Sequence, residues 1–495
     1  MRASNIGVAL ALLLTAAAVP SAAQGLEKAS PAPAPEVVAA AAEVQTVGPK
    51  VARLWRGYWP PQQAFIIYKP GEGALLISGE AGPPSFVALD RNGLPKALRG
   101  RAWFRPGTLE DARRPFMFDY PIGGGRTAIL VFADGRSGDL PSLIFHEQFH
   151  QHQRTAFEGP GAFDFVAPDA VPDRASFAAS AETERRVLAA ALTARPGKAR
   201  EKLLHSYFAL RREREAALGA DVLKVERGLE RIEGTAEFVE RAAAAYAAGS
   251  EKRLPALLSD SLREGLGAGG EPFALTWFRS RSYSVGAALT YFLRALDPKG
   301  WQRTIESGTP LDQRLAALLR FDRVPAPAAL ASEARAAFGY DAIRSDLAPK
   351  IEAAAQKEIK SVEEFYALGA YRLVFEAKGA VLGFTTGPGR MVQISQTQLV
   401  LPDPRFVSMK HPHALLTATE RPFLSETGEI GRYTALLPSV PTVNGLASLA
   451  PGEHRFDKVE VIGDGLKLTV ERPVIVTVSE GAMAIRLAET DPARS

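Results

Sequence analysis

The sequence predicts an α+β protein with several domains: a small N-terminal β-rich unit, a central domain that is mostly helical, and a C-terminal all-β module. Its 495 residues are enough for two or three domains of about 150 residues each. The local composition of the chain also changes twice. Short apolar runs between Gly and Pro give way to Ala-, Leu-, Arg- and Glu-rich stretches, and the short runs then return. We place these three units at 51–138, 139–355 and 356–495.

The first 23 residues are typical of a secretory signal peptide. An apolar run at 7–19 follows Arg2, and small residues at 20–23 predict cleavage after Ala23. This run is shorter than the roughly 20 residues of a membrane-spanning helix, which disfavours the alternative of a retained anchor. We therefore expect an exported protein, periplasmic or secreted, with no integral membrane segment once the signal peptide is removed.

Residues 24–50 are rich in Ala and Pro and have low complexity. This composition favours a flexible tether, so we expect folded structure to begin near Val51. Within 51–138, the apolar runs at 64–68 and 127–132 predict strands because Gly and Pro turns separate them.

The central and C-terminal units follow from periodicity. Helical spacing of apolar residues predicts helices at 182–194, 198–218, 222–248 and 284–296. Alternating and β-branched runs predict strands at 372–376, 392–396, 459–462 and 466–470. The C-terminal strands carry no ligand signature.

Composition excludes several kinds of chemistry. The chain has no Cys, so disulfides, thiolate nucleophiles and cysteine zinc sites are excluded, and any metal must be bound by His, Asp or Glu. The net charge of +4 is too small for a nucleic-acid-binding footprint, and we expect no nucleic-acid partner. The Arg-rich runs at 185–186 and 211–214 alternate with acidic residues, which predicts solvated helix faces rather than a phosphate-binding patch.

The clearest chemical signal is His146-Glu147-x-x-His150, a zincin signature. On a helix, residues four apart lie about 40° apart around the axis, so both imidazoles can reach one metal ion. Glu147 lies beside them, where it can accept a proton from a water molecule on the metal. The alternative is a solvated helix with two stray histidines, but Phe145 and Phe149 indicate that this helix is half-buried.

Two imidazoles leave a zinc site incomplete, because catalytic sites usually have three protein ligands. His152 is a poor third ligand because it lies about 240° around the helix from His146. Glu233 is a better candidate because small residues follow it, beginning with Gly234. A mid-helix Gly costs about 1 kcal/mol relative to Ala, so we expect a packing reason, such as close docking onto the helix of His146.

The motif pair resembles that of the gluzincin metallopeptidases, in which His-Glu-x-x-His is followed by Glu-Gly-x-Ala-x-aromatic. The resemblance covers about 140–300 and implies a zincin-like central domain with one Zn²⁺ per chain. It implies His146, His150 and Glu233 as metal ligands, Glu147 as general base, and a peptide or protein substrate. Less specifically, the chain is similar to an uncharacterised group of exported bacterial proteins. The 82-residue gap between His150 and Glu233 is longer than in thermolysin-like enzymes, so a helical insertion must separate them.

Other assignments of these carboxylates remain open. Glu226, Glu230, Glu233 and Glu237 recur on one helix face, so they could form a solvated stripe paired with neighbouring arginines. Glu184 is the alternative third ligand, or it belongs to an ordinary charged helix. Glu237 could also hold a ligand histidine through the ring nitrogen that does not bind the metal.

Hydrolysis of an amide also needs a group that stabilises the oxyanion. Tyr283 follows Glu233 by 50 residues, in the order seen in gluzincin aminopeptidases, but it could equally pack at a helix start. Arg281 could serve instead, or it could bind a substrate carboxylate.

These patterns together predict a zinc-dependent peptidase. The alternatives are a non-catalytic zinc-binding envelope protein that holds a partner, and a zinc hydrolase of another amide or ester. The presence of Glu147 favours an enzyme, because this is the residue that degenerate relatives usually lose. No Gly-x-Met-Glu-Asn stretch supports exopeptidase action.

Overall fold

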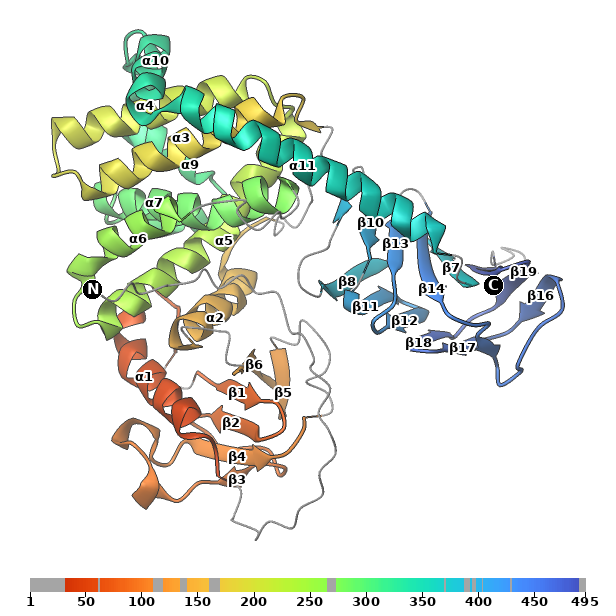
Figure 1. The fold of residues 1–495 in the computed structure, drawn as a ribbon. Helices are drawn as coiled ribbons and strands as arrows, with labels where there is room; N and C mark the ends of the chain where they lie inside the picture. Colours follow the sequence, from red (N-terminus) through yellow and green to blue (C-terminus); the bar gives the residue numbers. More distant parts are fainter. Residues whose placement is uncertain are drawn as a thin grey trace.

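The computed structural model describes residues 32–60, 63–109, 119–133, 140–159, 170–264, 273–368, 371–386, 392–393, 398–402, 404–427 and 430–488. The predicted signal peptide therefore lies outside the described residues. The architecture mixes helices and sheets, with a central helical region and C-terminal strands, as the sequence predicts (Figure 1). Across the described residues, every helix falls short of the length and apolarity that crossing a bilayer requires.

The predicted tether is wrong from residue 35 onward, because this segment forms helix α1 (Pro35–Val51). Its buried residues recur every three or four positions, which gives one continuous apolar stripe: Val37, Ala41, Val44, Val47 and Val51. Ala has the highest helix propensity, and Pro35 suits the first helical position. The stripe packs against the central helices and the N-terminal sheet, so α1 belongs to the main core.

The N-terminal strands form one six-stranded sheet in the order β3-β4-β2-β1-β6-β5. Its strands are β1 (Phe65–Lys69), β2 (Gly73–Ile77), β3 (Val87–Ala88), β4 (Ala102–Pro106), β5 (Asp119–Gly123) and β6 (Arg126–Phe132). The β1–β6 pair is parallel, and the other pairs are antiparallel. Phe65 and Ile67 join the core of the helices, whereas Ile66 on the opposite face joins a separate small cluster. The predicted β-rich unit therefore shares its core with the helical region.

The central region is built around α5 (Ala220–Ala247), which packs against α1, α2 and α7. The other helices are α2 (Leu140–Ala156), α3 (Arg174–Thr193), α4 (Lys198–Glu215), α6 (Leu254–Arg263), α7 (Arg281–Leu296), α8 (Trp301–Glu306), α9 (Leu311–Leu318), α10 (Pro327–Phe338) and α11 (Tyr340–Ala367). A π-helical segment, Leu275–Ser280, leads directly into α7. The four helices that the sequence predicts in this region are confirmed as α3, α4, α5 and α7.

Gly234 has a packing reason, but its partner differs from the predicted one. A Cβ atom on Gly234 would lie 2.4 Å from Cα of Gly286 on α7, and a Cβ on Gly286 would lie 2.2 Å from the carbonyl oxygen of Glu230. The backbones of α5 and α7 are therefore in direct contact at this crossing, which only glycine permits. The expected close docking of Gly234 onto α2 is wrong.

The C-terminal module consists of two sheets that share one core. The eight-stranded sheet has the order β16-β19-β20-β7-β14-β13-β10-β9, and the six-stranded sheet has the order β15-β17-β18-β12-β11-β8. The strands are β7 (Tyr371–Ala377), β8 (Val381–Thr386), β9 (Val392–Gln393), β10 (Gln398–Leu401), β11 (Pro404–His411), β12 (Ala414–Ala418), β13 (Phe423–Glu426), β14 (Gly431–Leu437), β15 (Thr442–Val443), β16 (Gly452–Phe456), β17 (Val459–Gly463), β18 (Leu466–Val470), β19 (Val474–Ser479) and β20 (Ala482–Leu487).

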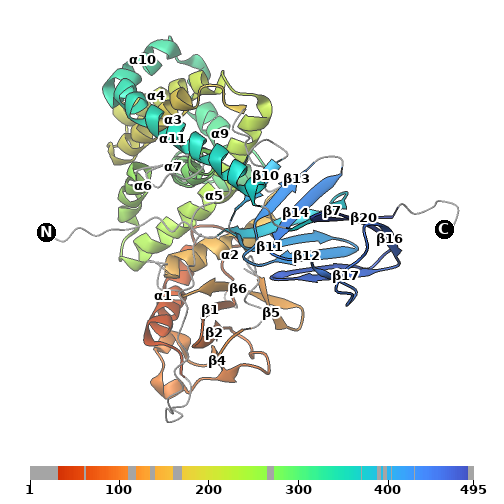
Figure 2. The same ribbon diagram turned by 45° about the vertical axis from the view of Figure 1, so that its right-hand side comes forward.

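Helix α11 connects the helical region to these sheets without a break (Figures 1 and 2). It runs through the predicted boundary between residues 355 and 356. Ile351 packs with the helical region, whereas Phe365 is buried against Val400 and Leu424 of the eight-stranded sheet. Both ends of the helix are therefore held by packing.

Candidate metal centre

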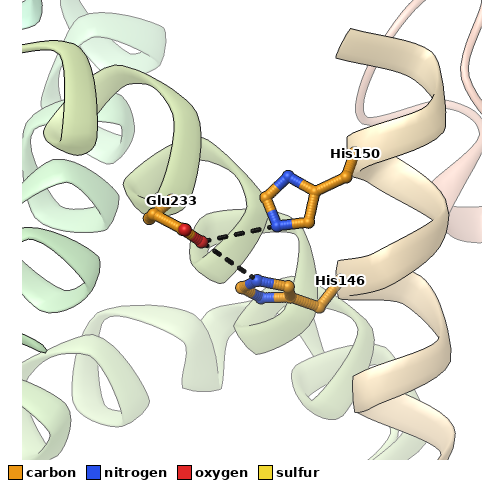
Figure 3. Close-up of side chains that lie close together, drawn as sticks. All are labelled: His146, His150 and Glu233. Carbon is orange, nitrogen blue, oxygen red and sulfur yellow. Dashed lines mark ion pairs between the residues drawn. The ribbon is translucent and has the colours of Figure 1, made fainter. Parts of the chain in front are cut away.

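Helices α2 and α5 bring His146, His150 and Glu233 together (Figure 3). Oε2 of Glu233 lies 3.4 Å from Nε2 of His150 and 3.7 Å from Nε2 of His146. The Glu233 side chain is only 2% exposed. In the sequence, 82 residues separate His150 from Glu233. Helices α3 and α4 lie within this separation, as the predicted helical insertion requires.

These three groups fit a metal ion. Oε2 of Glu233 is buried and has no hydrogen-bond partner, although leaving a buried carboxylate oxygen without a hydrogen bond is costly. The three donor atoms lie within 4.8 Å of one another. Zinc bonds of about 2.0–2.1 Å in a tetrahedral arrangement separate donor atoms by about 3.3 Å, close to the distances seen here. The site can therefore accept a cation with little movement.

The ring of His146 is held from its other side by Glu240. Nδ1 of His146 lies 2.9 Å from Oε2 of Glu240, which leaves Nε2 directed toward Glu233. The predicted partner, Glu237, is wrong: its Oε1 accepts hydrogen bonds from Arg241 at 2.7 Å and from the Ser261 hydroxyl at 3.3 Å. Glu240 follows Glu233 by seven residues, two helical turns, so helical spacing alone could have identified it.

His150 is held in the corresponding way by an amide. Its Nδ1 lies 2.7 Å from Oε1 of Gln153, one turn further along α2. The third histidine of this segment, His152, lies on the other side of the helix and packs against Trp55 and Phe149. The sequence excluded His152 from the site but did not identify Gln153.

The electrostatic surroundings of the three residues favour a positively charged imidazole beside a negatively charged carboxylate. Burial opposes protonation of His146, but the neighbouring carboxylates of Glu233 and Glu240 outweigh the effect of burial and raise the pKa of His146 well above its usual range. Burial also opposes ionisation of Glu233, yet the two histidines hold its pKa well below its usual range. A carboxylate faces positive charge here, and a proton on an imidazole supplies that charge when no metal is bound.

Glu147 lies between the two histidines in sequence and is buried. Burial raises the pKa of its carboxyl group, although the nearby His150 and His146 oppose this increase. A carboxylate with a raised pKa is a better proton acceptor, so its environment suits a general base.

Tyr283 lies against the site. Its ring is parallel to the His146 ring within 12°, with 5.7 Å between centroids. Nη2 of Arg279 donates to the Tyr283 hydroxyl at 3.2 Å and lies 3.3 Å from Oε1 of Glu233. Burial, aided by the charge of Glu233, raises the pKa of Tyr283 well above its usual range, so the phenol keeps its proton. Sequence reasoning missed Arg279, which lies on the π-helical segment; such segments are frequent at functional sites.

Arg281 is not available to a substrate. Its side chain is fully buried and donates to Glu226 and, at 3.4 Å, to Glu230. Glu184, the alternative third ligand, is also excluded, because both of its oxygens accept hydrogen bonds from Arg214 at 2.7 and 3.1 Å.

These residues form a buried ionic cluster of three arginines and three glutamates, which are Arg211, Arg214, Arg281, Glu184, Glu226 and Glu230. Arg185 is buried as well. The expected solvated faces at 185–186 and 211–214 are therefore wrong for Arg185, Arg211 and Arg214. The solvated acidic stripe on α5 is also wrong, because its four glutamates are buried.

Comparison with known proteins gave no match to a family model, a curated protein or a solved structure. The likeness to gluzincins thus rests on the two sequence motifs. The assignment of the site rests on its own geometry.

Proposed function

We propose that this protein is an exported zinc metallopeptidase. The observation that carries the proposal is Oε2 of Glu233, which is buried without a hydrogen-bond partner beside Nε2 of both motif histidines. Two imidazoles and one carboxylate are a ligand set found in catalytic zinc sites, where a fourth position stays open. His146, His150 and Glu233 are the proposed ligands. Bound zinc polarises a substrate carbonyl and lowers the pKa of coordinated water to about 7.

Glu147 is the proposed general base. It accepts a proton from the attacking water and passes it to the leaving nitrogen. Its burial supports this role, because the raised pKa of the carboxyl group makes it a stronger acceptor.

Tyr283 is the proposed donor to the substrate oxygen on which negative charge develops. The phenol keeps its proton because its pKa is raised. Arg279 donates to the phenolic oxygen and so holds the Tyr283 side chain beside the site.

Export follows from the predicted signal peptide at 1–23, and a peptide or protein substrate follows from the resemblance to gluzincins. The proposed activity therefore belongs outside the cytoplasm.

The test combines metal analysis with cleavage of a peptide mixture, with and without a chelator. We expect about one zinc per chain and cleavage that the chelator abolishes. Glu147→Gln should retain zinc and lose turnover, whereas the matched variant Glu158→Gln, which changes an exposed residue, should behave like wild type. Cleavage by Glu147→Gln at the wild-type rate would contradict the assignment of the base. Zinc binding without cleavage of any peptide or ester would favour the non-catalytic alternative.

A further inference from the structure

Gln153 makes three hydrogen bonds that use its whole amide group. Its Oε1 lies 2.7 Å from Nδ1 of His150. Its Nε2 donates to the carbonyl oxygen of Ile232 at 2.7 Å and to the Thr235 hydroxyl oxygen at 2.8 Å. The side chain is buried, so water does not replace these partners.

The partners on α5 determine which way this amide points. The Ile232 carbonyl can only accept a hydrogen bond. The Thr235 hydroxyl donates its own hydrogen to the carbonyl oxygen of Arg231 at 2.6 Å, so toward Gln153 it also accepts. A flipped amide would place Oε1 against two acceptors. The nitrogen of Gln153 must therefore face α5, and Oε1 must face His150.

This orientation fixes the tautomer of His150. Because Oε1 can only accept, Nδ1 of His150 must carry hydrogen, and a neutral ring then presents the lone pair of Nε2 to Glu233. Ile232 and Thr235 flank Glu233 in sequence, so one amide joins the ring of His150 to the turn of α5 that carries the proposed third ligand.

We infer that Gln153 is a positioning residue that selects the metal-binding tautomer of His150 and fixes its ring relative to Glu233. The inference rests on the proposed metal site. It assigns Gln153 no contact with the metal or the substrate. Its effect is on the geometry and affinity of the site, through His150.

Two measurements test this role in Gln153→Leu. The first is the tautomer of His150 in metal-free protein, read from long-range ¹H–¹⁵N spectra at a pH that makes the ring neutral. Wild type should show hydrogen on Nδ1, and Gln153→Leu should show a mixture. The second is the zinc dissociation constant from chelator competition, which should rise about 10- to 100-fold in Gln153→Leu.

Gln148→Leu is the matched control, because Gln148 is also a buried glutamine of α2 but bonds to Gln151 rather than to a histidine. It should keep the wild-type tautomer and zinc affinity. A Gln153→Leu protein that melts earlier but keeps both the tautomer and the zinc affinity would overturn the inference. If wild type bound no zinc, the proposed function would fail, and the tautomer measurement would still decide the role of Gln153.

Discussion

Two halves of one glutamate-rich face of α5 have opposite surroundings. Glu226 and Glu230 face the guanidinium groups of the buried ionic cluster. Glu233 and Glu240, further along the same helix, face imidazoles of α2. All four carboxylates are buried, so the helix and the degree of burial are shared, and the kind of cation differs.

The difference separates a permanent ion pair from an exchangeable one. The pKa of Arg214 is raised well above its usual range despite its burial, because Glu184 and Glu226 are adjacent, so its charge is fixed. An imidazole can release its proton and then bind a metal ion with the same nitrogen. The arginine-paired half of this face therefore suits a structural role, and the histidine-paired half suits metal binding.

The largest expected effect compares Glu226→Gln with Glu233→Gln in metal-free protein. Glu226→Gln removes one of the three carboxylates that balance three buried arginines, and breaking a buried ion pair costs about 3–5 kcal/mol. Glu233→Gln should cost less, because His146 can release its proton. Urea denaturation at neutral pH measures both free energies of unfolding. Equal losses would remove the distinction between the two halves.

Zinc should stabilise only through the histidine-paired half. A ligand at 100 times its dissociation constant adds about 2.7 kcal/mol to the free energy of unfolding. Glu233→Ala should lose most of this stabilisation by zinc. Glu184→Gln should be less stable than wild type without zinc, but zinc should stabilise it by the full amount. Thermal denaturation with and without zinc measures the gain. A larger loss of the stabilisation by zinc in Glu184→Gln than in Glu233→Ala would indicate that Glu184, and not Glu233, is the third metal ligand.

Glu240, which pairs with His146, and Glu237, which pairs with Arg241, provide a finer comparison. Glu240→Gln should weaken zinc binding about 10- to 100-fold, because Glu240 orients His146. Glu237→Gln should change it much less, since Glu237 bonds to Arg241 instead. Chelator competition measures both affinities, and the reverse order would restore Glu237 as the partner of His146.

The smallest effect is on pH dependence. In metal-free protein the raised pKa of His146 adds stability that is fully present below about pH 6.5, the usual value, and is lost as pH rises through the raised pKa. The lowered pKa of Glu233 adds stability above its usual value of about 4.5, which is lost as pH falls through the lowered pKa.

Zinc binding should also depend on pH, because zinc must displace the proton of His146. Below the raised pKa of His146, the affinity for zinc should rise by up to about tenfold, 1.4 kcal/mol, per pH unit. Melting curves with and without zinc over a pH series measure this. A zinc effect independent of pH would show that no proton is displaced.

Local patterns predicted the parts of the site that depend on one helix. The four-residue spacing of His146 and His150 sufficed to place them side by side on α2. Glu233 could be nominated from its sequence context, but its contact with α2 depends on how two helices pack. The Gly234–Gly286 crossing shows this limit: the sequence indicated a close approach, and the partner was a different helix.

Long-range charge pairing was not predictable from spacing. Arg211, Arg214 and Arg281 lie next to acidic or polar residues in sequence, as solvated residues do, yet their partners in the buried ionic cluster come from other helices. Similarly, the Ala-rich composition of 35–51 concealed an apolar stripe with helical spacing. In both cases, the position of each residue on its helix determines its burial, and local composition does not.

Helix α1 also has a consequence for how the chain folds. It packs against α5, whose first residue lies far along the sequence. Contacts between such distant segments slow folding, because a long loop must close before they form. During synthesis the apolar stripe of α1 emerges early, and the part of it that packs against α5 stays uncovered until α5 follows. Beyond the predicted signal peptide, a chaperone that binds exposed apolar helices would therefore meet this protein first at residues 35–51.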